Sequence, residues 1–230
     1  MDIIFPKKCL ICEKEGTFLC LNCLDKIALK LEQVCPYCEQ AITPQGKPCR
    51  RCQLSKTVVH LDHLVASCLY EEPLKKIIHR FKYNFVEELG KPLSQLLFQS
   101  FLKNNLDLPD LIVPVPLHQL RKRWRGFNQA EVLAENLAQL LAPGIGIEIF
   151  QGLRRTRFTN PQMKIKNYQK RRQNLEEAFS LENKNEIRGR HILLIDDIAT
   201  SGTTIFECTK VLRKSGAKYI SALILARQQC

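Results

Sequence analysis

Apolar and polar positions divide the chain into a first part with little apolar periodicity and a longer part in which helical and extended patterns alternate. Four stretches repeat apolar residues every three or four positions, as amphipathic helices do. They cover residues 71–83, 90–102, 128–141 and 203–214. The first of these has a basic outer face, and Asn128 followed by Glu131 gives the third the pattern of a capping box.

Short runs of apolar and β-branched residues predict strands between these helices. The runs cover residues 58–69, 111–117, 145–150, 192–195 and 219–226. Residues 192–195 are continuously apolar, which is typical of a parallel strand that is buried on both faces. Strands that alternate with helices predict an α/β fold with a parallel sheet. The basic segment 121–126, which follows two prolines, is interpreted as a loop.

Residues 1–57 contain too few aliphatic residues to bury a stable core alone, and prolines and glycines interrupt them. A segment of this kind needs a covalent or metal staple, and its cysteines offer one. We therefore expect two domains, a small cysteine-rich domain over residues 1–57 and an α/β domain over residues 58–230.

Eight of the 11 cysteines form four Cys-x-x-Cys pairs, and all of them precede residue 53. Two such pairs complete a tetrahedral Cys₄ set, the closed arrangement of structural zinc. We favour two Zn²⁺ ions held by sequential pairs. The alternatives are an interleaved pairing of the same residues, or a single ion if some of the pairs are vestigial. The predicted ligands are Cys9, Cys12, Cys20, Cys23, Cys35, Cys38, Cys49 and Cys52.

The composition is that of a globular protein, with 45% hydrophobic and 25% charged residues. The chain has no apolar run of the roughly 18 residues that a membrane-spanning helix needs. Its first residues also lack the apolar core of a secretory signal. We therefore expect no membrane insertion and a cytoplasmic location, where reduced thiols favour metal binding over disulfides.

The net charge of +12 is concentrated in runs that contain no acid. Residues 151–175 carry 8 basic residues and residues 118–129 carry 4, without an acidic residue in either run. Such runs favour an anionic partner, which could be phosphate, pyrophosphate or nucleic acid. A solvated basic face is the alternative interpretation of each run.

The strongest chemical pattern lies at residues 192–204, where an apolar strand leads into Asp196 and Asp197 and then into a turn of small, hydroxyl-bearing residues. The turn before the predicted helix would cradle a phosphate through backbone N–H groups and hydroxyls. The adjacent carboxylates suit the vicinal hydroxyls of a sugar, or Mg²⁺ held on them. The expected phosphate-binding residues are Ala199, Thr200, Ser201, Gly202, Thr203 and Thr204.

These 13 positions resemble the motif that binds phosphoribosyl pyrophosphate (PRPP) in type I phosphoribosyltransferases. The resemblance implies that the loop after residues 111–117 holds the pyrophosphate, through Arg121, Arg123 and Arg125. It also implies a flexible loop that closes over PRPP and contains Arg155, Arg157, Arg171 and Arg172. The other interpretation of this basic surface is a nucleic-acid site, with aromatic residues as stacking platforms. Those residues are Trp124, Phe127, Phe158 and Tyr168.

Over nearly its full length the chain resembles the ComF family, also called the ComFC/GntX-like group. The matching segments are the cysteine pairs, Tyr70 to Tyr83, 114–118, 125–130, 155–162, 171–174 and 196–204. The resemblance implies a type I phosphoribosyltransferase fold behind a double zinc ribbon. It also implies a role in DNA uptake, with single-stranded DNA and a competence helicase as partners.

Two functions remain open from the sequence. The first is a phosphoribosyltransferase that binds PRPP with Mg²⁺ and acts in DNA uptake or nucleotide metabolism. The second is a non-catalytic protein that binds single-stranded DNA and retains the PRPP site. The sequence identifies no catalytic nucleophile or base, no acceptor substrate and no oligomeric state.

Overall fold

A computed structural model describes residues 6–55, 60–83, 86–158, 177–200 and 202–228. The boundary expected at residues 57 and 58 therefore lies outside the described residues. None of the described helices is both long enough and apolar enough to cross a membrane.

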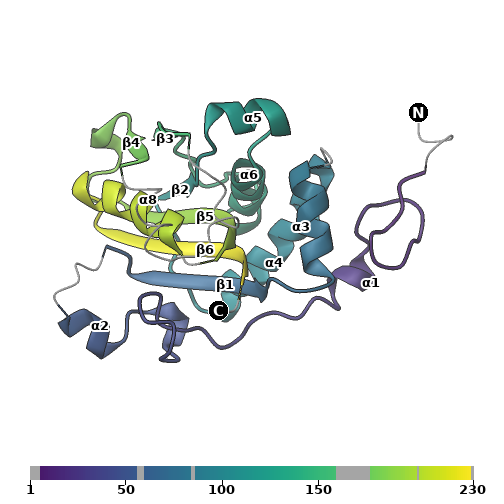
Figure 1. Ribbon diagram of the computed structural model, residues 1–230, viewed down its shortest axis with the longest axis horizontal. Helices are drawn as coiled ribbons and strands as arrows, with labels where there is room; N and C mark the ends of the chain where they lie inside the picture. Colours follow the sequence, from purple (N-terminus) through teal and green to yellow (C-terminus); the bar gives the residue numbers. More distant parts are fainter. Residues whose placement is uncertain (1–5, 56–59, 84–85, 159–176, 201, 229–230) are drawn as a thin grey trace.

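Four parallel strands form the central sheet, in the order β1-β6-β5-β2 (Figure 1). They are β1 (His63–Leu69), β2 (Leu111–Pro114), β5 (His191–Ala199) and β6 (Tyr219–Arg227). Two short antiparallel strands, β3 (Leu153–Arg155) and β4 (Phe179–Leu181), form a separate sheet. The parallel α/β sheet predicted from the sequence is confirmed.

Helices cover both faces of the central sheet because successive strand residues point to opposite sides. Leu193 and Ile195 of β5 join a core with three helices, α3 (Leu74–Tyr83), α4 (Gly90–Lys103) and α6 (Gln129–Leu141). Ile192 and Leu194 face the other core, which contains α8 (Thr203–Lys214) and the β3–β4 pair. In the part of the chain that the structure describes, short 3₁₀ turns also form at Pro44–Gly46, Glu87–Leu89 and Lys184–Glu186.

Three local predictions are corrected by the structure. Residues 121–126 are not a loop, because α5 (Gln119–Arg125) forms there with the His118 side chain accepting from the Leu120 N–H. Residues 145–150 form no full strand, since only Ile149 makes a parallel bridge, to Ile112. The strand expected over residues 192–195 continues to Ala199, so the two aspartates lie within it rather than after it.

The start of α6 agrees only in part with the capping-box prediction. Asn128 is the N-cap, and its Oδ1 accepts from the Ala130 N–H at 3.2 Å. The Glu131 carboxylate instead accepts from Lys122 at 2.6 Å. This ion pair joins α5 to α6, so the acid contributes to the docking of two helices.

The cysteine-rich segment contains two short helices, α1 (Leu21–Leu24) and α2 (Arg50–Leu54), and runs along the β1 edge of the sheet (Figure 1). Between the two sets of cysteine pairs, the Gln33 side chain both donates to the Ala66 carbonyl and accepts from the Ala66 N–H. The Lys30 N–H donates to the Ser67 carbonyl at 2.7 Å. These bonds satisfy backbone groups of the outermost strand, which would otherwise be an exposed edge.

Candidate functional site

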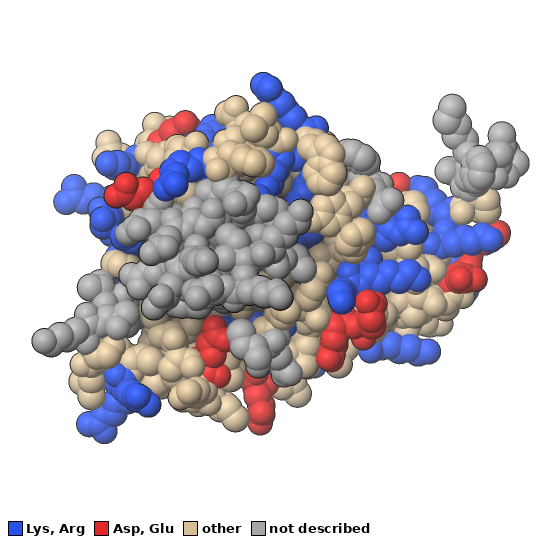
Figure 2. Space-filling model, viewed as in Figure 1, with Lys and Arg blue, Asp and Glu red and all other residues tan. Residues whose placement is uncertain are grey.

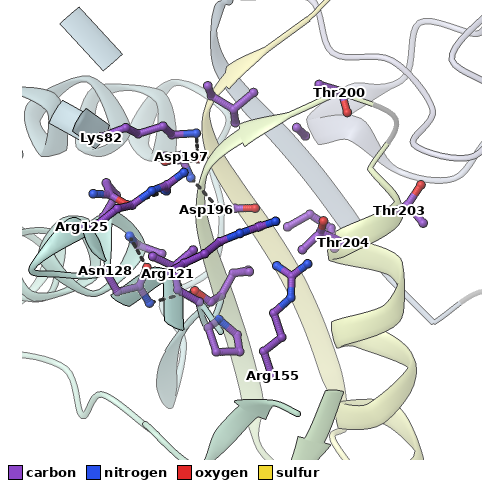
Figure 3. Close-up of a pocket in the computed structure, with 18 of the residues that line it drawn as sticks. Lys82, Arg121, Arg125, Asn128, Arg155, Asp196, Asp197, Thr200, Thr203 and Thr204 are labelled. Atoms are coloured by element: carbon purple, nitrogen blue, oxygen red, sulfur yellow. Dashed lines mark hydrogen bonds and ion pairs between the residues drawn. The ribbon is translucent and has the colours of Figure 1, made fainter. Parts of the chain in front are cut away.

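A pocket lies where β2 and β5 end at their carboxyl termini, which is the edge of a parallel sheet where ligands usually bind (Figure 3). The end of α3, the start of α6 and the loop before α8 form its other walls. Its charged lining residues are Lys82, Arg121, Arg125, Arg155, Asp196 and Asp197.

Two carboxylates from adjacent positions of β5 reach this pocket. The Asp197 carboxylate lies 2.9 Å from the Lys82 Nζ, and both side chains are largely buried. The Asp196 Oδ1 accepts from the Asp197 backbone N–H at 2.9 Å. Lys82 therefore neutralises only one of two neighbouring acids, and the pair can still take a cation or donor hydroxyls.

The environment of Asp196 disfavours its charged form. Burial first, and the charge of Asp197 second, raise the pKa of Asp196 to about 7, although Lys82 acts in the opposite direction. A divalent cation or a pair of sugar hydroxyls beside these acids would restore the charged form. The donor set thus fits Mg²⁺ carried on a polyol, which is bound by carboxylate oxygens.

The segment between β5 and α8 provides backbone donors on the opposite side of the pocket. We call residues 199–204 the phosphate loop; Ser201 lies outside the described residues. Gly202 is the N-cap of α8 with a φ of +67°, a conformation that glycine adopts at little cost. Thr200, Thr203 and Thr204 line the pocket at the positive end of the helix dipole.

Three guanidinium groups converge beside the carboxylates. Figure 3 shows the Arg121 and Arg155 side chains reaching toward the space between Asp196 and Thr204. Burial, followed by the nearby charge of Arg121, lowers the pKa of Arg155 to about 10, so it still carries its charge at neutral pH. The Arg125 guanidinium donates to Gln129 at 3.1 Å and stacks 5.1 Å from the Tyr83 ring centroid. An anion bound here would relieve the repulsion between these cations.

The structure separates the predicted arginines. Arg121 and Arg125 line the pocket, whereas Arg123 is exposed and lies outside the lining. Arg155 lies in β3 rather than in a loop, and Arg157 is exposed just after that strand. Arg171 and Arg172 fall outside the described residues, as do Pro161, Gln162 and Tyr168.

Each of the two sets of cysteines is gathered into a compact group. The four sulfur atoms of Cys9, Cys12, Cys20 and Cys23 lie within 4.8 Å of one another, and so do those of Cys35, Cys38, Cys49 and Cys52. The structure therefore groups the cysteines in the sequential order that the sequence analysis favours. Backbone donors of Ala41 and Gln40 lower the pKa of the Cys38 thiol to about 6, whereas burial, followed by the neighbouring cysteines, raises the pKa of Cys52 to about 12.

Comparisons with known proteins agree with this architecture. The phosphoribosyl transferase domain family matches residues 127–230. Competence protein F of Haemophilus influenzae is 34% identical over 97% of this chain and 98% of its own length. The DNA utilization protein YhgH of Escherichia coli K12 is 33% identical over 91% of this chain and 96% of its own length. This chain belongs to the ComF family.

The ComF chain also matches solved structures. The glutamine PRPP amidotransferase of Bacillus subtilis matches with a TM-score of 0.39 and 21% identity, covering 61% of this chain and 26% of that one.

Sequence reasoning missed one charged residue of the ComF pocket. Lys82 belongs to the helix for which the sequence predicts a basic outer face, yet its ammonium group lies against Asp197. The helical period could have indicated this position. Lys82 is four residues after Ile78 and next to Phe81, so it lies at the edge of the buried face of α3.

The ComF chain also has an exposed face of basic and aromatic residues at the mouth of this pocket. Figure 2 shows Lys and Arg side chains gathered over α5. Trp124 is 65% exposed and contacts the ring of Tyr83, and Phe158 is 57% exposed beside Arg121. Phe127 differs from these, because it is only partly exposed and packs on Phe81 in the core.

Proposed function

We propose that this ComF-family chain binds PRPP together with Mg²⁺ in the pocket between β2, β5 and α8, as a phosphoribosyltransferase-like protein of DNA uptake or nucleotide metabolism. One observation carries the proposal: a carboxylate pair, a helix N-terminus with hydroxyls and three guanidinium groups face the same space. PRPP presents a vicinal diol, a 5′-phosphate and a pyrophosphate, and these three groups need three different kinds of partner.

Each of the three sets of pocket residues would bind one part of PRPP. Asp196 and Asp197 would accept the ribose hydroxyls and hold Mg²⁺, which supplies charge neutralisation for the pyrophosphate when bound. Thr200, Thr203 and Thr204 would bind the 5′-phosphate. Arg121, Arg125 and Arg155 would hold the pyrophosphate, since guanidinium groups bind phosphate oxygens in a bidentate manner.

A transferase reaction in this pocket would rest on positioning and charge. The bond between C1′ and the pyrophosphate oxygen breaks, the electron pair leaves with the pyrophosphate, and a bond from the acceptor to C1′ forms. The arginines stabilise the negative charge of the leaving group, while the carboxylate pair stabilises the positive charge that develops on the ribose. No described residue is assigned as the nucleophile or base.

We also propose that each Cys₄ group holds a structural Zn²⁺, within a ribbon domain of residues 1–57 and ahead of a phosphoribosyltransferase domain of residues 58–230. Four sulfurs within 4.8 Å of one another match a tetrahedral site with no open position. Four thiolates at that separation repel one another, and a divalent ion removes the repulsion.

The affinity for PRPP is expected to fall as the pH is lowered, because the carboxylate of Asp196 must be charged to bind. Its pKa is raised to about 7, so from pH 8 to 6.5 the affinity should drop about threefold to fivefold. The stability of the unliganded fold should depend on pH in the opposite direction. Because the pKa of Asp196 is raised in the folded state, the free energy of unfolding falls as the pH rises through 7. Calorimetric titration of Mg²⁺ and PRPP across this range measures the effect.

Inorganic phosphate is the control for that experiment, because it titrates as the ligand does but needs only the phosphate loop. Its affinity should follow its own ionisation alone. A PRPP affinity that changes no more than that of phosphate between pH 6.5 and 8 would remove Asp196 from the binding site.

The exposed basic and aromatic face favours a second candidate function, the binding of single-stranded DNA. The exposed Trp124 and Phe158 rings would stack on bases, with Arg121 beside Phe158 and the exposed Arg123 of α5 available for the phosphates. Stacking contributes about 1–3 kcal/mol per base, so Trp124→Ala with Phe158→Ala should weaken binding of an oligothymidylate by about tenfold or more. Fluorescence anisotropy measures this affinity.

The matched control removes an exposed apolar side chain elsewhere, through Ile145→Ala at a position that is 91% exposed. This variant should bind the oligonucleotide as the wild type does. The dependence of affinity on salt should keep its slope in the aromatic variants and become shallower in Arg123→Gln, which removes a phosphate contact. Equal affinities in the wild type and the aromatic double variant would exclude this face.

A further inference from the structure

The second Cys₄ group touches the phosphate loop through a residue beside one of its cysteines. Tyr37 precedes Cys38, and its ring stacks on Phe206 with centroids 5.0 Å apart and planes 23° apart. Phe206 in turn lies against Gly202, where an added Cβ would come within 3.1 Å of the ring. An unbroken series of contacts therefore runs from this cysteine turn to the N-cap of α8.

A second contact starts from the other side of Cys38 and reaches the opposite end of the phosphate loop. The Glu39 carboxylate pairs with the Arg227 guanidinium at 2.9 Å, and Arg227 is buried at the end of β6. Arg227 is the register partner of Ala199 in the sheet, and the next residue, Gln228, donates its N–H to the Ala199 carbonyl at 3.1 Å. Both ends of the loop are thus supported from one turn.

The Tyr37 ring is held in place by its own hydroxyl. That oxygen accepts from the N–H groups of His60 and Leu61, at 3.0 and 3.1 Å. The position of the ring is therefore fixed by these hydrogen bonds, and Phe206 packs against a ring that does not move with the loop. The backbone of the turn is fixed further by Cys35, whose carbonyl accepts from the Glu39 N–H at 2.9 Å.

The first Cys₄ group has a different setting. Its buried members, Cys9 and Cys23, belong to the core that contains α3 and α4. Tyr37 and Phe206 pack instead against the core that contains α8, on the other face of the sheet. The two groups therefore offer a natural comparison within one chain.

We propose that the second Cys₄ turn positions the phosphate loop, with Tyr37 and Glu39 as positioning residues, so that metal binding at this group sets the affinity of the pocket for a sugar phosphate. That the ligand is a sugar phosphate rests on the proposed function, whereas the positioning of the loop by this turn does not. Loss of the metal would release the turn around Cys38 and, with it, both supports of the loop. The chain would then bind PRPP more weakly when the second group is empty than when it is loaded.

The experiment compares two matched double variants of the full chain. Tyr37→Leu with Glu39→Gln removes the ring stack and the ion pair of the second turn and keeps all eight cysteines. Phe18→Leu with Glu15→Gln likewise removes one aromatic ring and one carboxylate at the first group, where Phe18 contacts Lys7 and Glu15 forms an exposed pair with Lys8. Hydrogen exchange in peptides that cover residues 199–206 reports the loop directly, and calorimetry with Mg²⁺ and PRPP reports its affinity.

The variant of the second turn should exchange faster across the loop and bind PRPP about tenfold more weakly at wild-type zinc content. Its thermal midpoint should fall, because the buried Arg227 guanidinium loses its partner. The variant of the first group should leave the loop and the affinity unchanged. Tyr37→Phe keeps the stacked ring but loses the hydrogen bonds from the His60 and Leu61 N–H groups. It should therefore weaken PRPP binding and loosen the loop less than Tyr37→Leu does.

Unchanged exchange across residues 199–206 in Tyr37→Leu with Glu39→Gln, at full zinc content, would overturn the inference whatever happens to the affinity. Equal effects of the two double variants on the loop would overturn it as well. Faster exchange in a chain whose wild type binds no PRPP would uphold the coupling and refute the proposed function instead.

Discussion

Replacing Asp196 and Asp197 together with asparagine is expected to abolish detectable binding of Mg²⁺ and PRPP. The two carboxylates are the only acidic side chains among the described residues that line the pocket, and asparagine keeps their shape. Hydrogen bonds to charged groups contribute about 1.5–3 kcal/mol each, so the loss of two should weaken binding by a factor of about 100 or more. Calorimetric titration of each protein with Mg²⁺ and PRPP measures the change.

The same double variant changes the stability of the unliganded fold in two opposing ways. Removal of the Asp196 carboxyl, whose pKa is raised to about 7, relieves repulsion above that pH, whereas removal of the Asp197 carboxyl leaves the largely buried Lys82 ammonium without its partner. The thermal midpoint of the unliganded variant is therefore measured at pH 8 before its affinities are compared with those of the wild type. Binding of single-stranded DNA should be equal or tighter, because two negative charges are gone. Equal losses of PRPP and DNA affinity in a folded variant would show that the two sites are not separate.

A second pair of adjacent acids gives the matched control. Glu71 and Glu72 are exposed and lie outside the pocket lining. Glu71→Gln with Glu72→Gln changes the net charge by the same amount as the aspartate variant, and it should retain wild-type affinity for PRPP. A similar loss in both double variants would point to overall charge instead of the site.

Replacing one cysteine of either Cys₄ group with serine is expected to remove one zinc ion and unfold the ribbon that held it. Structural Zn²⁺ contributes about 10–16 kcal/mol of binding free energy in zinc-finger peptides, which is comparable to the whole stability of a typical domain. Cys9→Ser and Cys35→Ser should each lower the zinc content from two ions per chain to one. Metal analysis and limited proteolysis of freshly purified protein measure both effects.

Cys68 is the control position for the replacement of a thiol by a hydroxyl group. It is buried in β1, belongs to neither group and has its pKa raised to about 12 by burial. Cys68→Ser should lower the thermal midpoint, because it buries a hydroxyl group, yet retain both zinc ions. Retention of two zinc ions in Cys9→Ser or Cys35→Ser, or absence of zinc from the wild type, would contradict the assignment of the groups.

The parts of the fold that follow from local pattern could be predicted from the sequence. The apolar run at 192–195 and the leucine spacing of α4 and α6 each specify one element, because burial of a continuous run or stripe leaves few alternatives. The Cys-x-x-Cys spacing likewise specifies a metal turn. Even here the end of β5 was misplaced, since its pairing with β6 continues through Ile198 and Ala226.

The arginines of α5 show what a local pattern can hide. A run of basic residues after two prolines was interpreted as a loop, although Gln, Leu, Arg and Lys are good helix formers. Within the helix, Arg121 and Arg125 are four residues apart and share one face, while Arg123 points elsewhere. Only the helical period distinguishes the two arginines that line the pocket from the one that does not.

The remaining parts of the site depend on contacts between distant segments. Lys82 meets Asp197 because the end of α3 lies above the end of β5, and Tyr37 meets Phe206 because the cysteine-rich segment crosses the edge of the sheet. No local periodicity encodes such pairs. They follow from the strand order β1-β6-β5-β2, which sequence patterns alone do not determine.

The most direct test of the central claim is a calorimetric titration of PRPP, with Mg²⁺ present, into the folded chain with its zinc content measured. We predict saturable binding at one site per chain, lost in Asp196→Asn with Asp197→Asn and retained in Glu71→Gln with Glu72→Gln. Absence of binding to the folded, zinc-loaded wild type would contradict a PRPP site and leave single-stranded DNA as the leading ligand.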